Sequence, residues 1–159
     1  MGVSLLCVGK LRERYFMDAA AEYLKRLSRL MPVTLVEVPD ESEPSKPSLA
    51  LEKQMMRKEG ERLLARLDKE TYVIALCIEG KQPSSEELAQ RIQHFFANGT
   101  SKVAFVVGGS LGLHDVVLQR ANERMSMSRL TLPHQLARVV LLEQLFRAAK
   151  INAGEKYHK

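Results

Sequence analysis

The chain has 159 residues and a formal net charge of +5, with 45% hydrophobic and 27% charged residues. This length fits one domain that can bury a core without disulfides or a structural metal. The longest stretches without a charged residue, such as 103–114, are shorter than the roughly 18 to 20 apolar residues of a membrane span. No basic residue precedes the first apolar run, so we expect no secretory signal and a cytoplasmic location.

Basic residues are concentrated toward the C-terminus. Residues 110–159 hold eight Lys or Arg and four Asp or Glu, which accounts for +4 of the +5. This asymmetry favours a partner that carries phosphates, although a solvated basic face without a partner remains an alternative. Cys7 and Cys77 lie far apart in apolar, strand-like runs and lack metal-ligand spacing. We therefore expect two buried, reduced thiols and no bound metal.

Short apolar runs alternate with longer segments of helical period, the pattern of an α/β fold with a mainly parallel sheet. The first half of the chain predicts a strand at 3–8, a helix with apolar positions from Tyr15 to Leu30, a strand at 33–38, a loop at 39–48, a helix at 49–67 and a strand at 72–78. Ser84 and Glu87 form a capping box that starts the next helix. The remainder predicts a strand at 102–107, a helix from His114 to about Arg124, a short strand at 125–130 and a helix at 136–151. We expect a single domain over residues 1–159.

The last predicted helix is apolar on almost every side. A helix without a polar face must be covered on both sides, so we expect it to meet a second subunit. Glu143 stands nearly alone among apolar residues, with Arg138 and Arg147 five and four positions away. We expect it to form ion pairs with these arginines rather than to act as an acid catalyst.

The stretch FVVGGSLGLHDVVLQRA, from Phe105 to Ala121, joins an apolar run to a helical pattern through a glycine-rich corner. It resembles the dinucleotide fingerprint G-x-G-x-x-G, but Val107 occupies the place of the first glycine and the corner comes too late in the chain. The Gly-Lys-Ser/Thr of a P-loop is also absent. By itself this corner therefore fits either a sharp structural turn or a binding site.

Three irregular corners follow apolar strands in the second half of the chain, at 79–81, 108–112 and 130–134. Ligands bind at the carboxyl ends of strands in an open parallel sheet. We therefore expect the three corners to form one composite pocket, built mostly from backbone and small residues.

Four segments carry a resemblance that covers the whole chain. They are IEGK at 78–81, FVVGGSLGL at 105–113, MSMSRLTLPHQLARVVLLEQLFRA at 125–148 and the terminal EKYHK at 155–159. Together they resemble the ribosomal RNA large-subunit methyltransferase H family, which belongs to the SPOUT class of S-adenosylmethionine-dependent RNA methyltransferases. The resemblance implies an α/β domain with a C-terminal deep trefoil knot, a topology that general rules of chain threading discourage.

The resemblance also implies a site and a substrate. The S-adenosylmethionine site would be lined by Leu76, Gly108, Met127, Ser128, Arg129, Leu130, Thr131 and Leu132. The last helix would pair two subunits in a homodimer and bring the C-terminal tail of one beside the cofactor of the other. The substrate would be N3 of a pseudouridine in helix 69 of 23S ribosomal RNA, within the assembled ribosome.

In that arrangement Tyr157 and His158 would be catalytic, with His158 as the candidate base, and Arg147 and Lys159 would contact RNA. A tail that only grips RNA phosphates is an equal alternative. We expect His134 to order its turn by hydrogen bonding, and His94 and His114 to lie on a helix surface and at a helix start. A non-catalytic ribosome- or RNA-binding α/β protein remains the alternative function, and a nucleotide-dependent enzyme is disfavoured by the missing glycine.

Overall fold

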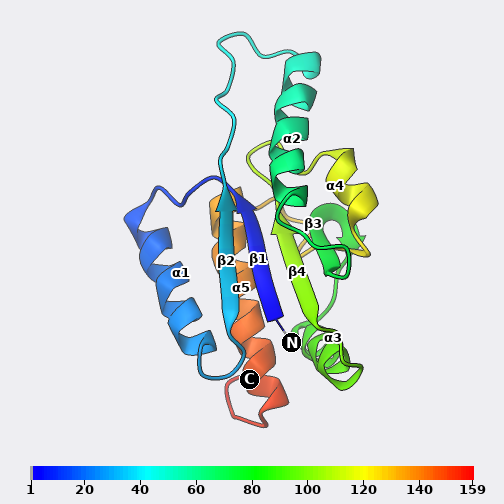
Figure 1. Cartoon of the computed structure of the whole chain (residues 1–159). Coiled ribbons are helices and arrows are strands. Elements are labelled where there is room, and N and C mark those ends of the chain that lie inside the picture. Colours follow the sequence, from blue (N-terminus) through cyan, green and yellow to red (C-terminus); the bar gives the residue numbers. More distant parts are fainter. Residues whose placement is uncertain (1) are drawn as a thin grey trace.

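Five parallel strands form one sheet in the computed structural model, which describes residues 2–159. They are β1 (Gly2–Val8), β2 (Val33–Val38), β3 (Tyr72–Lys81), β4 (Lys102–Val107) and β5 (Glu123–Met125), in the order β2-β1-β4-β3-β5. The helices are α1 (Arg14–Leu27), α2 (Leu49–Leu64), α3 (Ser85–Ala97), α4 (Asp115–Arg120) and α5 (His134–Asn152). The predicted α/β fold with a parallel sheet is confirmed (Figure 1).

Helices cover both faces of the sheet, because the central strands are apolar on both sides. In β1, Leu5 and Cys7 join the core beneath α1, α3 and α5, whereas Leu6 and Val8 join the core beneath α2 and α4. The residues of β4 alternate in the same way, with Phe105 fully buried on the α5 side. The sheet is therefore the middle layer of three.

Two elements differ from the sequence prediction around β5. The helix expected to reach Arg124 ends at Arg120, because the Asn122 side chain and N–H are already hydrogen-bonded to the backbone of Val73. The strand expected at 125–130 was wrong: the strand is Glu123–Met125, and the chain then leaves the sheet. Serine side chains bond to nearby backbone there, with Ser126 Oγ donating to the Ser128 carbonyl at 3.0 Å.

Two other elements are longer than predicted. Strand β3 continues through the expected corner at 79–81, where a bulge lets Lys81 pair with Met125. Helix α5 begins at His134 rather than 136, directly after Pro133, whose fixed φ suits a helix start. Within residues 2–159 no helix is both long and apolar enough to cross a membrane.

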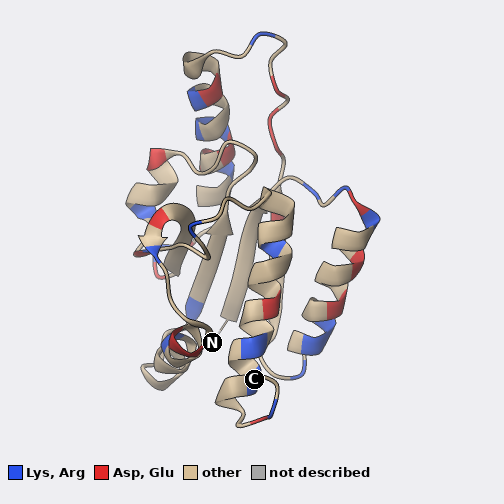
Figure 2. Cartoon of the chain, turned by 180° about the vertical axis from the view of Figure 1, so that it is seen from behind, with Lys and Arg blue, Asp and Glu red and all other residues tan. Residues whose placement is uncertain are grey.

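Helix α5 packs between α1 and α3, and its buried stripe includes Arg138, Leu141, Leu142 and Leu145. Val140, Glu143 and Arg147 lie on the opposite, half-buried side. Figure 2 shows single charged positions spaced along the ribbon of α5, with more along α1 beside it. The outer side is therefore mixed rather than uniformly apolar, which corrects the sequence expectation.

Candidate functional site

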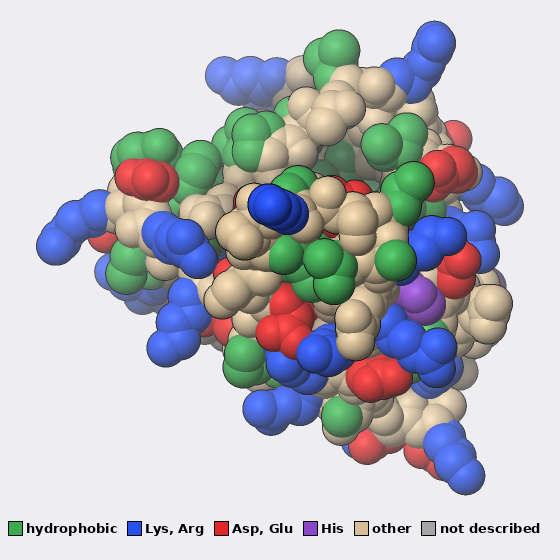
Figure 3. All heavy atoms as spheres, turned by 90° about the horizontal axis from the view of Figure 1, so that it is seen from above, with side chains coloured by type: hydrophobic (Ala, Val, Ile, Leu, Met, Phe, Trp, Pro, Cys, Tyr) green, Lys and Arg blue, Asp and Glu red, His purple; other side chains and the backbone are tan. Residues whose placement is uncertain are grey.

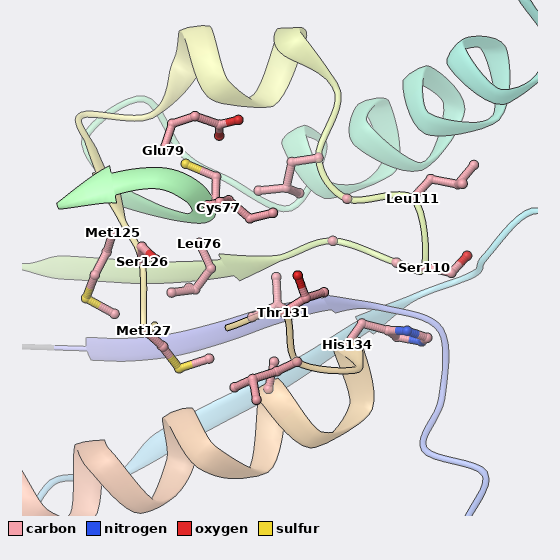
Figure 4. Close-up of a pocket in the computed structure, with 18 of the residues that line it drawn as sticks. Leu76, Cys77, Glu79, Ser110, Leu111, Met125, Ser126, Met127, Thr131 and His134 are labelled. Carbon is pink, nitrogen blue, oxygen red and sulfur yellow. The ribbon is translucent and has the colours of Figure 1, made fainter. Parts of the chain in front are cut away.

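A cavity of about 830 Å³ lies at the carboxyl ends of β3 and β4, a size within the usual range for small-molecule sites. Its walls come from the end of β3 (76–79), the glycine loop after β4 (107–113) and the segment between β5 and α5 (125–134, without Arg129). The first wall starts slightly before the corner that the sequence suggested. The three regions nevertheless form one composite pocket, as expected (Figure 4).

Seven of the eight residues assigned to the cofactor by resemblance line this cavity, and Arg129 does not. Leu76 and Met127 come from different segments, and Thr131 lies to one side of both, toward His134 (Figure 4). The remaining members are Gly108, Ser128, Leu130 and Leu132. Leucine and methionine side chains beside exposed loop backbone suit a flat, apolar group with polar edges, which is the chemistry of adenine. The residues present therefore fit an adenosine-containing cofactor.

Glycine is required at 108 by the loop itself. A Cβ at Gly108 would lie 2.5 Å from the carbonyl carbon of Gly112, so any side chain would push the loop apart. Gly112 has a φ of +88°, which only glycine adopts without strain. Gly80 is equally constrained, since a Cβ there would lie 2.4 Å from the Met125 backbone. The glycines thus shape the walls by letting backbone segments touch each other.

Cys77 lies at the cavity wall and is only half-buried, in contrast to the fully buried Cys7. The expectation of two buried thiols therefore holds for Cys7 alone. Burial raises the pKa of Cys7 to about 12. Partial burial, and then the nearby Glu79, also raise the pKa of Cys77, so both side chains stay as thiols near neutral pH.

His134 starts α5 and borders the cavity. Burial, and then the charge of Arg138, lower its pKa, which keeps the ring neutral near pH 7. Its side chain makes no hydrogen bond within residues 2–159, so the ordering role expected for it is not seen. His114 caps α4, with Nδ1 accepting from the N–H of Val116 at 3.1 Å, and His94 is exposed on α3, both as predicted.

The C-terminal tail lies at the opposite end of α5 from the cavity. Helix α5 has 19 residues and is therefore about 28 Å long. The cavity adjoins its first turn, whereas Tyr157 packs on Phe146 near its last turns, with ring centroids 5.0 Å apart. Within one chain, the tail and the cavity are not brought together.

Hydrogen bonds hold the tail in place. The Tyr157 hydroxyl donates to Glu143 at 3.2 Å, and burial and this carboxylate both raise the pKa of Tyr157. Arg147 donates to Nδ1 of His158 at 3.3 Å, so Nε2 carries the proton and donates to Glu86 at 2.7 Å. In this arrangement Arg147 occupies the Nδ1 lone pair that a base would use.

Four of the eight Lys and Arg residues in 110–159 make contacts within the chain that stabilise the fold. Arg147 pairs with Glu143, as expected, but buried Arg138 pairs with Glu37 rather than Glu143. Lys150 pairs with Glu155, and Arg120 donates to backbone carbonyls before β3. The four others make no ion pair within residues 2–159: Arg124, Arg129, Lys156 and Lys159. These four are the ones free to meet a phosphate.

The sequence alone did not indicate Glu59 of α2 as a candidate site residue. It is 7% exposed and lies against the glycine loop, although glutamate in a helix usually faces solvent. The neighbouring Gly60 was a signal, because a helical glycine often marks close packing. A Cβ at Gly60 would lie 3.0 Å from Val117 of α4.

Within residues 2–159, no cluster of three or more His, Cys, Asp or Glu side chains could hold a metal.

Comparison with known proteins identifies the chain as a member of a methyltransferase family. Residues 1–158 match the family described as "Predicted SPOUT methyltransferase". Proteins named ribosomal RNA large subunit methyltransferase H are 55% identical in Listeria monocytogenes and 52% identical in Bacillus thuringiensis, each over 100% of both chains.

Solved structures show the same fold. A probable methylase family protein from Haemophilus influenzae has a TM-score of 0.56 at 14% identity, covering 99% of this chain and 70% of its own. A probable methyltransferase from Bordetella pertussis has a TM-score of 0.55 at 18% identity, covering 92% and 95%.

Proposed function

Because the chain belongs to the SPOUT methyltransferase family, and to its ribosomal RNA large-subunit methyltransferase H branch, we propose that it methylates large-subunit ribosomal RNA with S-adenosylmethionine. The target is N3 of a pseudouridine in helix 69 of the 23S RNA, in the assembled ribosome. The observation that supports this most directly is the cavity, where seven residues expected to hold the cofactor meet from three separate segments.

Binding is the first task of the cavity residues. Leu76, Met127 and Leu132 offer apolar contact to the adenine, and the loop backbone around Gly108 offers hydrogen bonds. When bound, S-adenosylmethionine supplies a methyl group on a positively charged sulfur, which is already a good leaving group. The protein's contribution is therefore to align the acceptor nitrogen and to exclude water.

The acceptor nitrogen must lose a proton, and the tail supplies the groups for this step. His158 takes the N3 proton once Arg147 releases its Nδ1 atom. Arg147 is then free to stabilise the negative charge that develops on the base. Tyr157 stays protonated, since its pKa is raised, and orients the neighbouring groups through Glu143.

Two copies of the chain complete each site. A two-fold axis perpendicular to α5 would set two α5 helices antiparallel, which places the last turn of one beside the first turn of the other. The tail at the far end of α5 then reaches the cavity of the partner. Val140 and Leu136 on the half-buried side of α5 support a homodimer there. The same family membership leads us to propose the trefoil knot and a cytoplasmic location.

Mass spectrometry of ribosomal RNA tests the function. Ribosomes that lack the modification are incubated with the protein and isotope-labelled S-adenosylmethionine, and the RNA is then digested. We expect one labelled methyl group on N3 of a single pseudouridine, and little label on a short isolated hairpin, because the 18.0 kDa chain has little surface for reading a long sequence. RNA binding without cofactor binding would instead indicate a non-catalytic ribosome-binding protein.

A further inference from the structure

A second cavity, of about 480 Å³, adjoins the first across the glycine loop. The two cavities share Gly109, Ser110, Leu111 and His134 in their walls. Figure 4 shows Ser110 and His134 at one end of the first cavity, away from Met125 and Met127. The second cavity therefore begins where the mainly apolar lining of the first one ends.

The lining of the second cavity differs in kind from that of the first. It carries charges of both signs: Lys10 and Arg12 from the loop after β1, Asp40, Glu41 and Glu43 from the loop after β2, and Glu59 from α2. Figure 3 shows this face from above, with acidic and basic side chains close together around its hollows. No Phe, Tyr or Trp side chain is among the lining residues. Charges of both signs around one small cavity suit a small group that itself carries both charges.

Glu59 is the one deeply buried acid of this cavity, at 7% exposure. Its Oε2 atom accepts a hydrogen bond from the N–H of Glu41 at 3.0 Å, whereas Oε1 has no hydrogen-bond partner within residues 2–159. A Cβ placed on Gly109 would lie 3.4 Å from Oε1, so the carboxylate lies directly against the shared wall.

No cation within residues 2–159 forms a salt bridge with Glu59. Burial raises its pKa, the hydrogen bond from the Glu41 N–H lowers it by less, and the charge of Asp40 raises it again, so the net shift is upward. A buried carboxylate without a positively charged partner is costly, and a positively charged hydrogen-bond donor would reduce that cost.

We propose that the second cavity binds the amino-acid end of the methyl donor, with Glu59 accepting a hydrogen bond from the α-ammonium group and Lys10 and Arg12 facing the α-carboxylate. This inference rests on the proposed function, because it takes S-adenosylmethionine as the ligand. The two halves of that molecule match the two cavities: the adenosine suits the apolar one, and the zwitterionic amino acid suits the charged one. The glycine loop lies between them, and glycine at 109 leaves room beside the carboxylate.

Calorimetric titration with two related ligands tests the assignment without any turnover. S-adenosylhomocysteine carries the amino-acid end, and 5′-methylthioadenosine keeps the adenosine and the sulfur but lacks that end. Glu59→Gln removes the charge and keeps an acceptor for the N–H of Glu41. We expect it to weaken S-adenosylhomocysteine about tenfold or more, as for a lost charge-assisted hydrogen bond, and to leave 5′-methylthioadenosine within about twofold.

Two further variants sharpen the test. Glu61→Gln, two residues along α2, removes an exposed carboxylate outside the cavity and should change neither affinity. Arg12→Ala with Lys10→Ala removes exposed charges and should weaken only S-adenosylhomocysteine. This pair keeps the proposal testable if Glu59→Gln does not fold.

Equal weakening of both ligands by Glu59→Gln would overturn the proposal, because it would indicate a structural role. Unchanged affinity for S-adenosylhomocysteine would overturn it as well. If the unaltered protein binds both ligands equally well, the amino-acid end has no site here, while the proposed methyltransferase function stands. If it binds neither, the proposed function fails and this inference fails with it.

Discussion

Arg138 of α5 donates a hydrogen bond to Glu37 of the edge strand β2 at 2.7 Å, and its guanidinium is 1% exposed. The same guanidinium donates to the carbonyls of Val8 and Gly9 at 3.2 and 3.0 Å. One side chain therefore fastens the start of α5 to the carboxyl ends of β1 and β2. This fixes the helix that borders both cavities.

Arg138→Leu should destabilise the protein by about 2 to 4 kcal/mol, because it leaves Glu37 and two backbone carbonyls without a partner. Urea unfolding followed by circular dichroism measures the change. The matched control is Arg57→Leu, which removes an exposed pair with Glu61 and should cost less than about 0.5 kcal/mol. Equal losses in the two variants would contradict a special role for Arg138.

Gly108→Ala should weaken S-adenosylmethionine binding more than tenfold and lower stability. The added Cβ meets the Gly112 backbone at 2.5 Å, and backbone cannot turn aside as a side chain can. Gly99→Ala provides the comparison, since Gly99 has a φ of +70° but open space around it. It should cost about 1 kcal/mol of stability and leave the affinity unchanged. Normal binding by Gly108→Ala would show that the loop tolerates expansion.

Glu59→Gln should be more stable than the unaltered protein at neutral pH. The pKa of Glu59 is raised on folding, by burial first and then by Asp40 and Glu41, so the unfolded chain releases its proton at a lower pH than the folded chain does. Stability therefore falls as pH rises from the ordinary value of 4.5 through the raised pKa. Glutamine has no proton to release, so the advantage should vanish below about pH 4.5.

Urea midpoints at several pH values, with Glu61→Gln as the exposed reference, measure this difference. A Glu59→Gln variant that is less stable than the unaltered protein at pH 7 would show that the carboxylate is stabilised in the fold. A binding group that lowers stability is the expected pattern for a functional residue.

The tail should act in the partner's cavity. Removing residues 157–159 should abolish methylation and leave S-adenosylmethionine affinity within about twofold, because the residues expected to hold the cofactor all lie between Leu76 and Leu132. Gly108→Ala should also be inactive. Heterodimers formed from these two inactive variants contain one intact pair of cavity and tail, so mixing them should restore activity. Continued inactivity of verified heterodimers would place the tail elsewhere.

Val140→Glu should prevent dimer formation through α5. Val140 is half-buried on the outer side of the helix, next to Glu143, so a new carboxylate there adds repulsion and removes apolar contact. Light scattering coupled to size-exclusion chromatography measures the mass, and methylation should fall with it. Gln54→Glu, at an exposed position of α2 on the other face of the sheet, changes the charge by the same amount and serves as the control. A Val140→Glu protein that remains dimeric would place the interface on another face.

The sequence by itself determined the order of elements and the composite pocket. Alternating apolar runs are enough to predict a parallel sheet, since buried strands must be apolar on both faces, and the capping box at Ser84 and Glu87 formed as predicted. Strand ends that follow such runs meet at one edge of the sheet, so three corners could be joined into one site. The prediction of a strand at 125–130 was wrong because the serine side chains there hydrogen-bond to nearby backbone, and these local bonds outweigh a weak strand pattern.

Only the tertiary structure decided the partners of charged side chains. Arg138 and Glu37 are 101 residues apart in the chain, and no local pattern indicates that they meet. Glu59 has the neighbours of an ordinary helical glutamate, yet it is buried because α2 and the glycine loop approach each other there. Hydrophobic periodicity records which face of an element is covered. It does not record which distant residue covers that face, and ion pairs and binding cavities depend on that second fact.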